Sequence, residues 1–473
     1  MLCELPTELL DSILQHVPHD DLQQVRLVSK YISDAATPHA FYHFHVGFFI
    51  FSLHKFIAIS QSRVAKHVKK LTFHPELLPS WNREEWEQNI DFRPPFSQWL
   101  KTASPARDVT GRSLASEQYD ALSRHSFTPY ELDVGWHAFQ ARSAEQSNWR
   151  EHREGVVFRE CFSSLPNLTE AVVQPAKPYV SVGRLNDSTF WSALVGEILV
   201  GPDSWSYGSR NDLLDGAAAL SLLEAAGFRA SFSGVRMIER LTLDILTTLS
   251  LLETMGCTYG SLGERDPTNH AQRYHAIFDA FRSLRELVLS CPHAPDVYEI
   301  GGGGQAEEML DLLKTAKEVR VLGLMYGNAE KTDFSTHPTN FGLGPFFATS
   351  EIVWPHITSL ALEASTPAEP FTNFLALHSH TLRRLEIRDA VSDDWRVVLE
   401  AFPRLLKLEH VYLECLWNWK ADSSGPPVDD DDEVMELDEG SYVCYFEEGT
   451  DDETEVNRKL MGFLLRGEGT LSL

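Results

Sequence analysis

The first forty residues carry apolar side chains at helical spacing, interrupted by prolines and polar residues. Pro6 suits the first turn of a helix, and Pro18 is expected to end that helix. The apolar stripe of this helix consists of Leu9, Leu10, Ile13, Leu14 and Val17. A second helix is predicted to have Asp20 as its N-cap, with Gln23 closing a capping box. Its stripe consists of Leu22, Val25, Val28 and Ile32. Two short helices cannot bury this much aliphatic surface between themselves, so part of it must face another domain or another protein.

The order of these residues resembles the F-box, a three-helix module that docks onto the Skp adaptor of cullin–RING ubiquitin ligases. The resemblance is carried by Leu5–Pro6, Glu8–Leu10, Ile13–Leu14, Asp21–Leu22 and Val25–Lys30. Position by position, it implies adaptor contacts at Leu5, Pro6, Leu9, Ile13, Leu14, Leu22, Val25, Val28 and Ser29. A third helix is expected around residues 31–36, and Pro38 is expected to cut any extension toward Phe41. The alternative is an amphipathic hairpin that packs on its own domain.

The rest of the chain repeats one apolar pattern that is typical of short buried strands. The stretch Phe41–Phe51 predicts a strand, and Ser52–Gln61 predicts a helix. A triplet with the spacing apolar, two residues, apolar, one residue, apolar then begins at residues 68, 168, 238, 284, 319, 357, 382 and 408. The last five intervals are 46, 35, 38, 25 and 26 residues. Amphipathic helices are expected before several triplets, at Ala271–Phe281, Glu307–Ala316, Phe371–His378 and Trp395–Phe402.

A helix that returns the chain to a short parallel strand is the unit of a curved solenoid. This region therefore resembles a degenerate leucine-rich-repeat array, although the usual Asn is missing from the repeats and their length is irregular. The predicted fold class is α/β, with an N-terminal F-box at 1–40 and an irregular leucine-rich-repeat-like solenoid at 41–473. A compact α/β fold with buried strands is the alternative.

Two stretches interrupt the predicted array. Residues 75–162 are rich in Trp and predict a helical insertion with helices at Leu114–His125 and Glu131–Arg153. Residues 421–440 predict an acidic, disordered loop, before a closing strand at Ser441–Phe446 and a helix at Glu455–Gly469.

Charge and cysteine usage narrow the class of protein. The net charge is −27, but Ala421–Glu455 holds 15 acidic residues and no Lys or Arg, which leaves −12 for the remainder. This acidity argues against nucleic acid as the main partner. Six scattered cysteines without close pairs favour a reducing compartment. The chain begins directly with the helical motif, and the apolar stretch Phe44–Ile59 is broken by charged residues and histidines. We therefore expect no signal peptide, no membrane span, and a cytoplasmic or nuclear location.

No motif of a known enzyme class occurs in the sequence, so no catalytic residue, cofactor or metal site is predicted. The best metal-like cluster is His39, His43 and His45, but no Cys or carboxylate lies near in sequence to complete it. Gly301–Gly304 lacks the Lys of a phosphate-binding loop, and Asp429–Glu433 lacks the Gly of a calcium loop.

These observations predict a substrate-recognition subunit of an SCF-type ubiquitin ligase. The F-box would bind the Skp adaptor and the solenoid would bind a target protein, so that catalysis on other subunits proceeds by proximity. One alternative is a scaffold protein that works outside any ligase. A less favoured alternative is a hydrolase or metalloenzyme in the α/β body.

Overall fold

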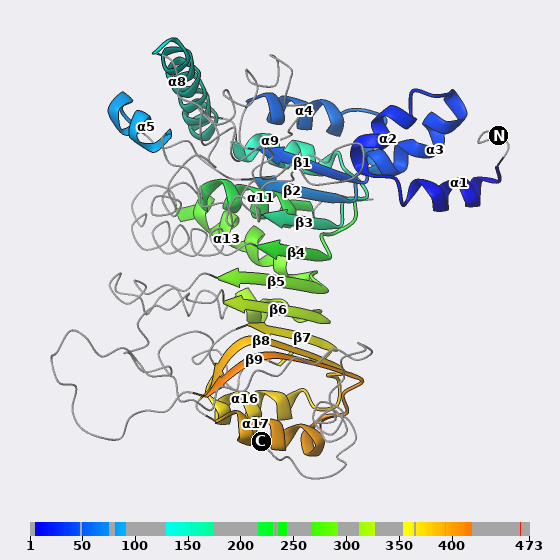
Figure 1. Cartoon of the computed structure of the whole chain (residues 1–473), viewed down its shortest axis with the longest axis vertical. Coiled ribbons are helices and arrows are strands. Elements are labelled where there is room, and N and C mark those ends of the chain that lie inside the picture. Colours follow the sequence, from blue (N-terminus) through cyan, green and yellow to red (C-terminus); the bar gives the residue numbers. More distant parts are fainter. Residues whose placement is uncertain are drawn as a thin grey trace. The chain divides into compact units, whose positions relative to one another are not determined.

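A computed structural model describes residues 5–47, 50–74, 81–90, 129–152, 154–173, 216–229, 232, 235–243, 267–291, 312–326, 353–363, 366–392, 394–418 and 464 (Figure 1). The chain forms two compact units. The first consists of Met1–Asn167 and Val173–Leu222, and the second of Leu168–Val172 and Leu223–Leu473. Residues 41–167 therefore group with the N-terminal helices, whereas the sequence interpretation assigned them to the solenoid.

The first unit begins with three helices, α1 (Thr7–Leu14), α2 (His19–Val25) and α3 (Lys30–Ala40). They share a small core of buried apolar side chains, which consists of Leu10, Leu14, Leu22, Ala36 and Ala40. The prediction of Asp20 as N-cap was wrong, because α2 already begins at His19 with Pro18 at the N-cap. The carbonyl of Pro18 accepts the amides of Asp21 and Leu22 at 3.0 and 3.1 Å, so the first turn forms two residues earlier than a cap at Asp20 would place it.

The second predicted helix is in fact divided between two helices. Helix α2 ends at Val25. Ser29 caps α3, because its Oγ accepts a hydrogen bond from the amide of Ile32 at 3.2 Å. Pro38 lies inside α3 and does not end it. Because Pro38 stands in the last turn, it removes only one intrahelical bond, and the amide of Phe41 still reaches the carbonyl of Thr37 at 3.1 Å.

The remainder of the first unit joins a pair of parallel strands to several helices. The strands are β1 (His43–Gly47) and β2 (Lys70–His74), in the register His43↔Lys70 to Gly47↔His74. The helices are α4 (Ile50–Ser60), η2 (Ala65–His67), α5 (Arg83–Ile90), α8 (Pro129–His152) and α9 (Glu154–Ser163). Aromatic rings of α4, β2 and α9 meet in a buried cluster that includes Phe56, Phe73, Phe158 and Phe162.

Several predictions for this unit can be compared directly. The strand expected at Phe41–Phe51 is confined to β1, because α4 begins at Ile50. The helices expected at Ser52–Gln61 and Glu131–Arg153 are confirmed by α4 and α8. The helix expected at Leu114–His125 lies outside the described residues, as do the acidic loop and Ser441–Phe446.

The second unit is built on an open sheet whose strands follow one another in chain order (Figure 1). Its strands are β3 (Glu170–Val173), β4 (Arg240–Leu243), β5 (Glu286–Cys291), β6 (Val321–Tyr326), β7 (Ser359–Glu363), β8 (Arg384–Ser392) and β9 (His410–Asn418). Strands β4 to β9 are all parallel, so their first residues lie along the same end of the sheet. Each predicted triplet from residue 168 onward therefore marks a strand. A solenoid arrangement of these strands remains a prediction.

The middle residues of the triplets stand directly beside one another across the sheet. In register they are Leu241, Leu287, Leu322, Leu360, Leu385 and Val411, and every one is buried. The third residues form a second buried row of the same kind, from Leu243 to Leu413. These two rows form the inner face of the sheet, because side chains two positions apart on a strand share a face.

The strands also begin with one repeated backbone arrangement. The carbonyl of the residue before one strand accepts two consecutive amides at the start of the next strand. Arg285 O, for example, accepts from Arg320 N at 2.8 Å and from Val321 N at 3.0 Å. The same arrangement recurs at Thr169, Glu239, Arg320, Thr358 and Arg383. The triplets are thus one local structure that is repeated, rather than a coincidence of composition.

The helices of the second unit lie between these strands in the chain. They include α13 (Pro267–Arg282), α16 (Ala368–Leu377) and α17 (Trp395–Leu405), while α11 (Gly216–Phe228) contains residues of both units. They confirm the helices expected at Ala271–Phe281, Phe371–His378 and Trp395–Phe402. Of Glu307–Ala316, only the last residues lie in the described part, where 312–315 are helical. No described helix has both the length and the apolar content to cross a membrane.

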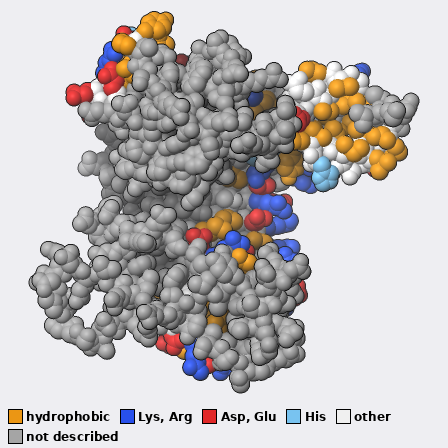
Figure 2. All heavy atoms as spheres, in the orientation of Figure 1, with side chains coloured by type: hydrophobic (Ala, Val, Ile, Leu, Met, Phe, Trp, Pro, Cys, Tyr) orange, Lys and Arg blue, Asp and Glu red, His pale blue; other side chains and the backbone are white. Residues whose placement is uncertain are grey.

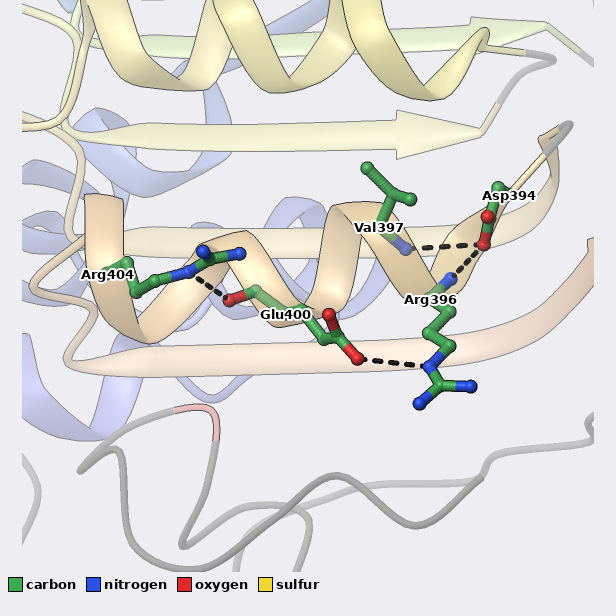
Figure 3. A network of polar contacts seen from close by, with 5 residues as sticks. All are labelled: Asp394, Arg396, Val397, Glu400 and Arg404. Carbon is green, nitrogen blue, oxygen red and sulfur yellow. Dashed lines mark hydrogen bonds and ion pairs between the residues drawn. The ribbon is translucent and has the colours of Figure 1, made fainter.

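Helix α17 shows how a strong local signal sets a helix start (Figure 3). Asp394 is its N-cap, and the carboxylate accepts the amides of Arg396 and Val397 at 3.0 and 3.3 Å. On the exposed side, Arg396 pairs with Glu400 at 3.0 Å, and Arg404 Nε donates to the Glu400 carbonyl at 3.0 Å. The opposite side carries Trp395, Val398, Leu399 and Phe402 into the core.

Two buried basic side chains hold connecting segments in the second unit. Arg229 is fully buried and donates to the carbonyls of Arg236 and Leu168, at 2.9 and 3.0 Å. Burial lowers the pKa of Arg229 to about 10, so it stays charged at neutral pH. His378 is bonded on both ring nitrogens, with Nδ1 at 2.9 Å from the Phe374 carbonyl and Nε2 at 3.1 Å from the Trp354 amide. Because Nε2 accepts a hydrogen bond from the Trp354 amide, it carries no proton, and this imidazole is neutral.

Candidate functional site

Helix α1 is apolar on two sides. Leu10 and Leu14 are 2% exposed and belong to the core of the three N-terminal helices. Leu9 and Ile13, which are also four residues apart, are 56% and 46% exposed. Residues at this spacing lie on one face of a helix, so a second apolar face of α1 is turned to solvent.

A second exposed apolar group lies in the turn between α2 and α3. Leu27 is 79% exposed and Val28 is 67% exposed. Their amides bond to the carbonyls of Gln24 and Val25 at 3.0 and 3.1 Å, which fixes this turn as a tight extension of α2. The side chains of both residues consequently point away from the small core that α2 and α3 share.

The two groups are joined by a contact between the start of α3 and the start of α1. Tyr31, three residues after Val28, donates its hydroxyl to the carbonyl of Leu5 at 3.1 Å. We define the apolar surface as Pro6, Leu9, Ile13, Leu27 and Val28, all of which are exposed. Figure 2 shows hydrophobic side chains gathered over the part of the molecule that holds α1, α2 and α3. Such a concentration of exposed apolar side chains is typical of a protein-binding surface.

Polar contacts fix the helices beneath this surface. His39 of α3 lies 2.7 Å from a carboxylate oxygen of Asp11 on α1, and Ser29 caps α3. The guanidinium of Arg26 stacks over the ring of Phe41, 4.7 Å from its centroid. The three helices are therefore tied to one another through contacts that leave Leu9, Ile13, Leu27 and Val28 uncovered.

Residues 2–44 match the family model of the F-box domain. F-box domains bind Skp-type adaptors of cullin–RING ligases, and proteins that carry one are typically non-catalytic substrate receptors. The match covers α1, α2 and α3 and the beginning of β1. No curated protein matches this chain. The leucine-rich-repeat resemblance of the strands is not confirmed and stays a prediction.

The structure sorts the predicted adaptor-contacting residues into three groups. Four are exposed, namely Pro6, Leu9, Ile13 and Val28. Three are half-buried, namely Leu5, Val25 and Ser29. Leu14 and Leu22 are buried in the core of the F-box. Leu27 was absent from the predicted set, although it is the most exposed large apolar residue of the described part of the chain. Its apolar character next to Arg26, outside the helical stripe, was the signal that could have identified it.

The histidines considered as metal ligands are engaged in other contacts. His39 contacts Asp11 of the F-box. His43 Nε2 lies 2.8 Å from the hydroxyl of Thr72, and His45 Nδ1 lies 3.2 Å from His74 Nε2. Among the residues that the structure describes, no group of three or more His, Cys, Asp or Glu is arranged to hold a metal ion.

Cys161 of α9 is a buried free thiol. Burial raises its pKa to about 11, so almost none of it is thiolate at neutral pH. This cysteine is therefore a core residue and not an activated nucleophile.

Proposed function

We propose that this chain is a substrate-recognition subunit of an SCF-type cullin–RING ubiquitin ligase. The observation that carries the proposal is the apolar surface, because it lies on the F-box and exposes large aliphatic side chains. Full burial of one Leu, Ile or Val side chain is worth roughly 1.5–3 kcal/mol, so an adaptor that covers these residues gains a substantial driving force.

Within this proposal the predicted contact residues have two roles. Pro6, Leu9, Ile13, Leu27 and Val28 touch the adaptor, with Leu5, Val25 and Ser29 at the margin of the contact. Leu14 and Leu22 hold α1 and α2 in place from the core side. A change at Leu14 or Leu22 would then weaken binding through the fold of the F-box, whereas a change at Leu9 or Ile13 would act on the contact itself.

The second unit would bind the target protein and hold it near the ubiquitin-charged enzyme. Its parallel strands alternate buried leucines with side chains on the opposite face, which supplies a rigid surface for recognition. The chemistry would take place on other subunits, and this chain would contribute proximity alone. Cytoplasmic or nuclear location is part of the proposal, since the adaptor has to be reached there.

Co-expression with a Skp adaptor, followed by purification through a tag on the adaptor, tests the proposal. The wild-type chain is expected to co-purify, and the double variant Leu9→Asp, Ile13→Asp is expected to be lost, because two carboxylates would be buried at the contact. The matched control is Tyr130→Asp, Val134→Asp. These residues are also exposed apolar residues four positions apart on a helix, α8, outside the F-box.

Each result has a defined meaning. Loss in the α1 variant with retention in the α8 control supports the proposal. A folded wild type that fails to co-purify contradicts it and favours a scaffold protein outside any ligase. Equal loss in both variants also contradicts it, since binding would then depend on general surface polarity.

A further inference from the structure

The starts of strands β6 to β9 form a basic edge on an acidic protein. The residues that lead into these strands, 316–320, 355–359, 379–384 and 406–410, are here named the strand-start turns. They contain five Lys and Arg residues, namely Lys317, Arg320, Arg383, Arg384 and Lys407. Their acidic residues are Glu318 and Glu409. The whole chain carries a net charge of −27, so this local excess of positive charge is opposite in sign to the charge of the chain.

The neighbouring strands show that such cations can be neutralised within the sheet. Arg240 at the start of β4 pairs with Glu286 of β5 at 3.2 Å, and Arg285 pairs with Glu239 at 3.4 Å. These pairs join adjacent strands, since Arg240 and Glu286 are register partners. The arginines before β4 and β5 are therefore matched by carboxylates next to them.

The corresponding positions of β6 to β8 lack that match. Arg320 precedes β6 and Arg384 opens β8, and both are exposed. Within the described residues, neither guanidinium makes an ion pair with a carboxylate. At the start of β7, which lies between them, stand Thr358 and Ser359, where the starts of β4 and β5 have charged residues. Glu386, the nearest carboxylate along β8, is paired with Arg388 at 2.5 Å.

The backbone places these groups at the spacing of one anion-binding site. Adjacent strands lie about 4.8 Å apart, so the starts of β6 and β8 are separated by roughly 10 Å with the two hydroxyl residues between them. Thr358 donates its hydroxyl to the Arg320 carbonyl at 3.2 Å. Arg383 is held by its own turn, because its guanidinium donates to the carbonyls of Leu382 and His380, both at 2.8 Å. Figure 2 shows Lys and Arg side chains, with Asp and Glu side chains among them, at the surface where strands of this sheet begin.

We propose that Arg320, Arg383 and Arg384, with Ser359 between them, bind an acidic segment of the target protein. This inference rests on the proposed function and assigns a chemical class to the substrate. Arginine binds carboxylates and phosphates through paired N–H donors, and hydroxyl groups of Ser and Thr complete such sites. Phosphorylated serine offers the same chemistry with more charge, so a segment bearing it would bind more tightly.

A protein segment fits this edge better than a nucleic acid does. Glu318 and Glu409 lie among the cations and would repel a continuous phosphate backbone. A peptide can place its acidic side chains between Arg320 and Arg384 and avoid both glutamates.

The test uses the full-length chain, with and without the Skp adaptor, and three labelled ten-residue peptides, measured by fluorescence anisotropy. The first peptide alternates serine and glutamate, the second has phosphorylated serines, and the third has glutamine in place of glutamate. The double variant Arg320→Gln, Arg384→Gln removes two positive charges from the proposed site. The matched control Arg396→Gln, Arg404→Gln removes two from the exposed side of α17.

We expect the glutamate peptide to bind, the phosphorylated peptide to bind at least tenfold more tightly, and the glutamine peptide not to bind. The site variant should lose at least tenfold in affinity for both acidic peptides, while the α17 control keeps wild-type affinity. Equal loss in both variants would overturn the inference, because binding would follow overall charge. Failure of both acidic peptides to bind would also overturn it, as would single-stranded RNA displacing them at lower concentration than a competing acidic peptide.

The adaptor separates failure of this inference from failure of the proposed function. A chain that binds the adaptor but neither acidic peptide keeps the proposed function and loses the acidic-segment site. A chain that binds the acidic peptides in the site-dependent way but not the adaptor keeps the site and loses the role in a ligase.

Discussion

The F-box and the sheet of the second unit use leucine in opposite ways. In the sheet, every leucine of the triplets from β4 to β9 is buried, and the alternate positions combine charged and polar residues with half-buried ones such as Val288 and Tyr412. In the F-box, Leu10 and Leu14 are buried while Leu9 and Ile13 on the same helix are exposed. Successive side chains of a strand alternate strictly between two faces, so the leucines that share one face are all buried together. A short helix that is apolar on two sides can bury only one of them in its own core, and a partner can bind the other.

The largest expected effect comes from truncating a buried leucine of the sheet. Leu385 of β8 is fully buried, and Leu385→Ala should lower the free energy of unfolding by about 2–5 kcal/mol through lost burial and a cavity. Leu27→Ala removes the same atoms from an exposed site and should change it by less than about 0.5 kcal/mol. Urea denaturation followed by circular dichroism measures both. Similar values for the two variants would contradict the assignment of Leu27 as surplus.

The next effect concerns adaptor binding. Leu27→Ala should weaken binding of the adaptor by about 10- to 100-fold, which corresponds to the loss of one buried leucine side chain. Isothermal titration calorimetry with the purified adaptor gives the affinity. Val353→Ala, at another exposed apolar position but in the second unit, serves as the control. If Leu27→Ala binds as tightly as the control does, the contact does not include the turn between α2 and α3.

A smaller effect concerns pH and the second unit. Burial lowers the pKa of His378 below its ordinary value of 6.5. Above pH 6.5 the imidazole is neutral in both the folded and the unfolded chain, so stability is independent of this group. Below pH 6.5 the unfolded chain takes up the proton first, and stability falls by at most about 1.4 kcal/mol per pH unit until the folded pKa is reached.

Denaturation of wild type and His378→Gln at pH 7.5 and 5.5 isolates this contribution. The wild type should lose more stability on acidification than the variant does, because glutamine cannot take up the proton. An identical loss in the two proteins would show that His378 does not contribute to the pH dependence.

The smallest effect compares the two polar helix caps. Ser29→Ala and Asp394→Ala each remove side-chain acceptors at a helix start and should each cost about 1 kcal/mol. Only the Ser29 change should also weaken adaptor binding, because Ser29 follows the turn that holds Leu27 and Val28. Denaturation and calorimetry on both variants test this difference. Equal adaptor binding by the two variants would mean that the turn keeps its position without the cap.

The strands were predictable because their signal is strong and local. Each triplet places two apolar residues on the inner face of a strand and buries a third just before the strand, and the parallel neighbour repeats the same spacing. The helix boundaries were less predictable, since they depend on which of two adjacent starts is better bonded. Pro18 provides the first carbonyl of α2, and Asp20 therefore falls inside the helix.

The exposed and buried residues of α1 could not be separated from the sequence. Leu9 and Ile13 have the same spacing as Leu10 and Leu14, so periodicity placed all four on one apolar stripe. The outcome depends on where α3 packs, and this is decided by tertiary contacts such as His39 with Asp11. Leu27 lay outside the apolar stripes of the first and second predicted helices and was missed for that reason. The family match places the F-box on residues 2–44, close to the limits that the motif predicted.

The backbone arrangement at the strand starts has a consequence for how such a protein evolves. At each start two consecutive amides are committed to the carbonyl of the preceding strand, as with Arg383 and Arg384 on Thr358. Proline is excluded from both positions, but the side chains are not needed for this bonding, even where one adds to it, as the Thr358 hydroxyl does at the Arg320 carbonyl. Arginine, threonine, serine, glutamate and histidine all occur at these positions in one chain. Substitutions can therefore change the side chains along this edge one residue at a time, while the backbone hydrogen bonds that hold the strands stay the same.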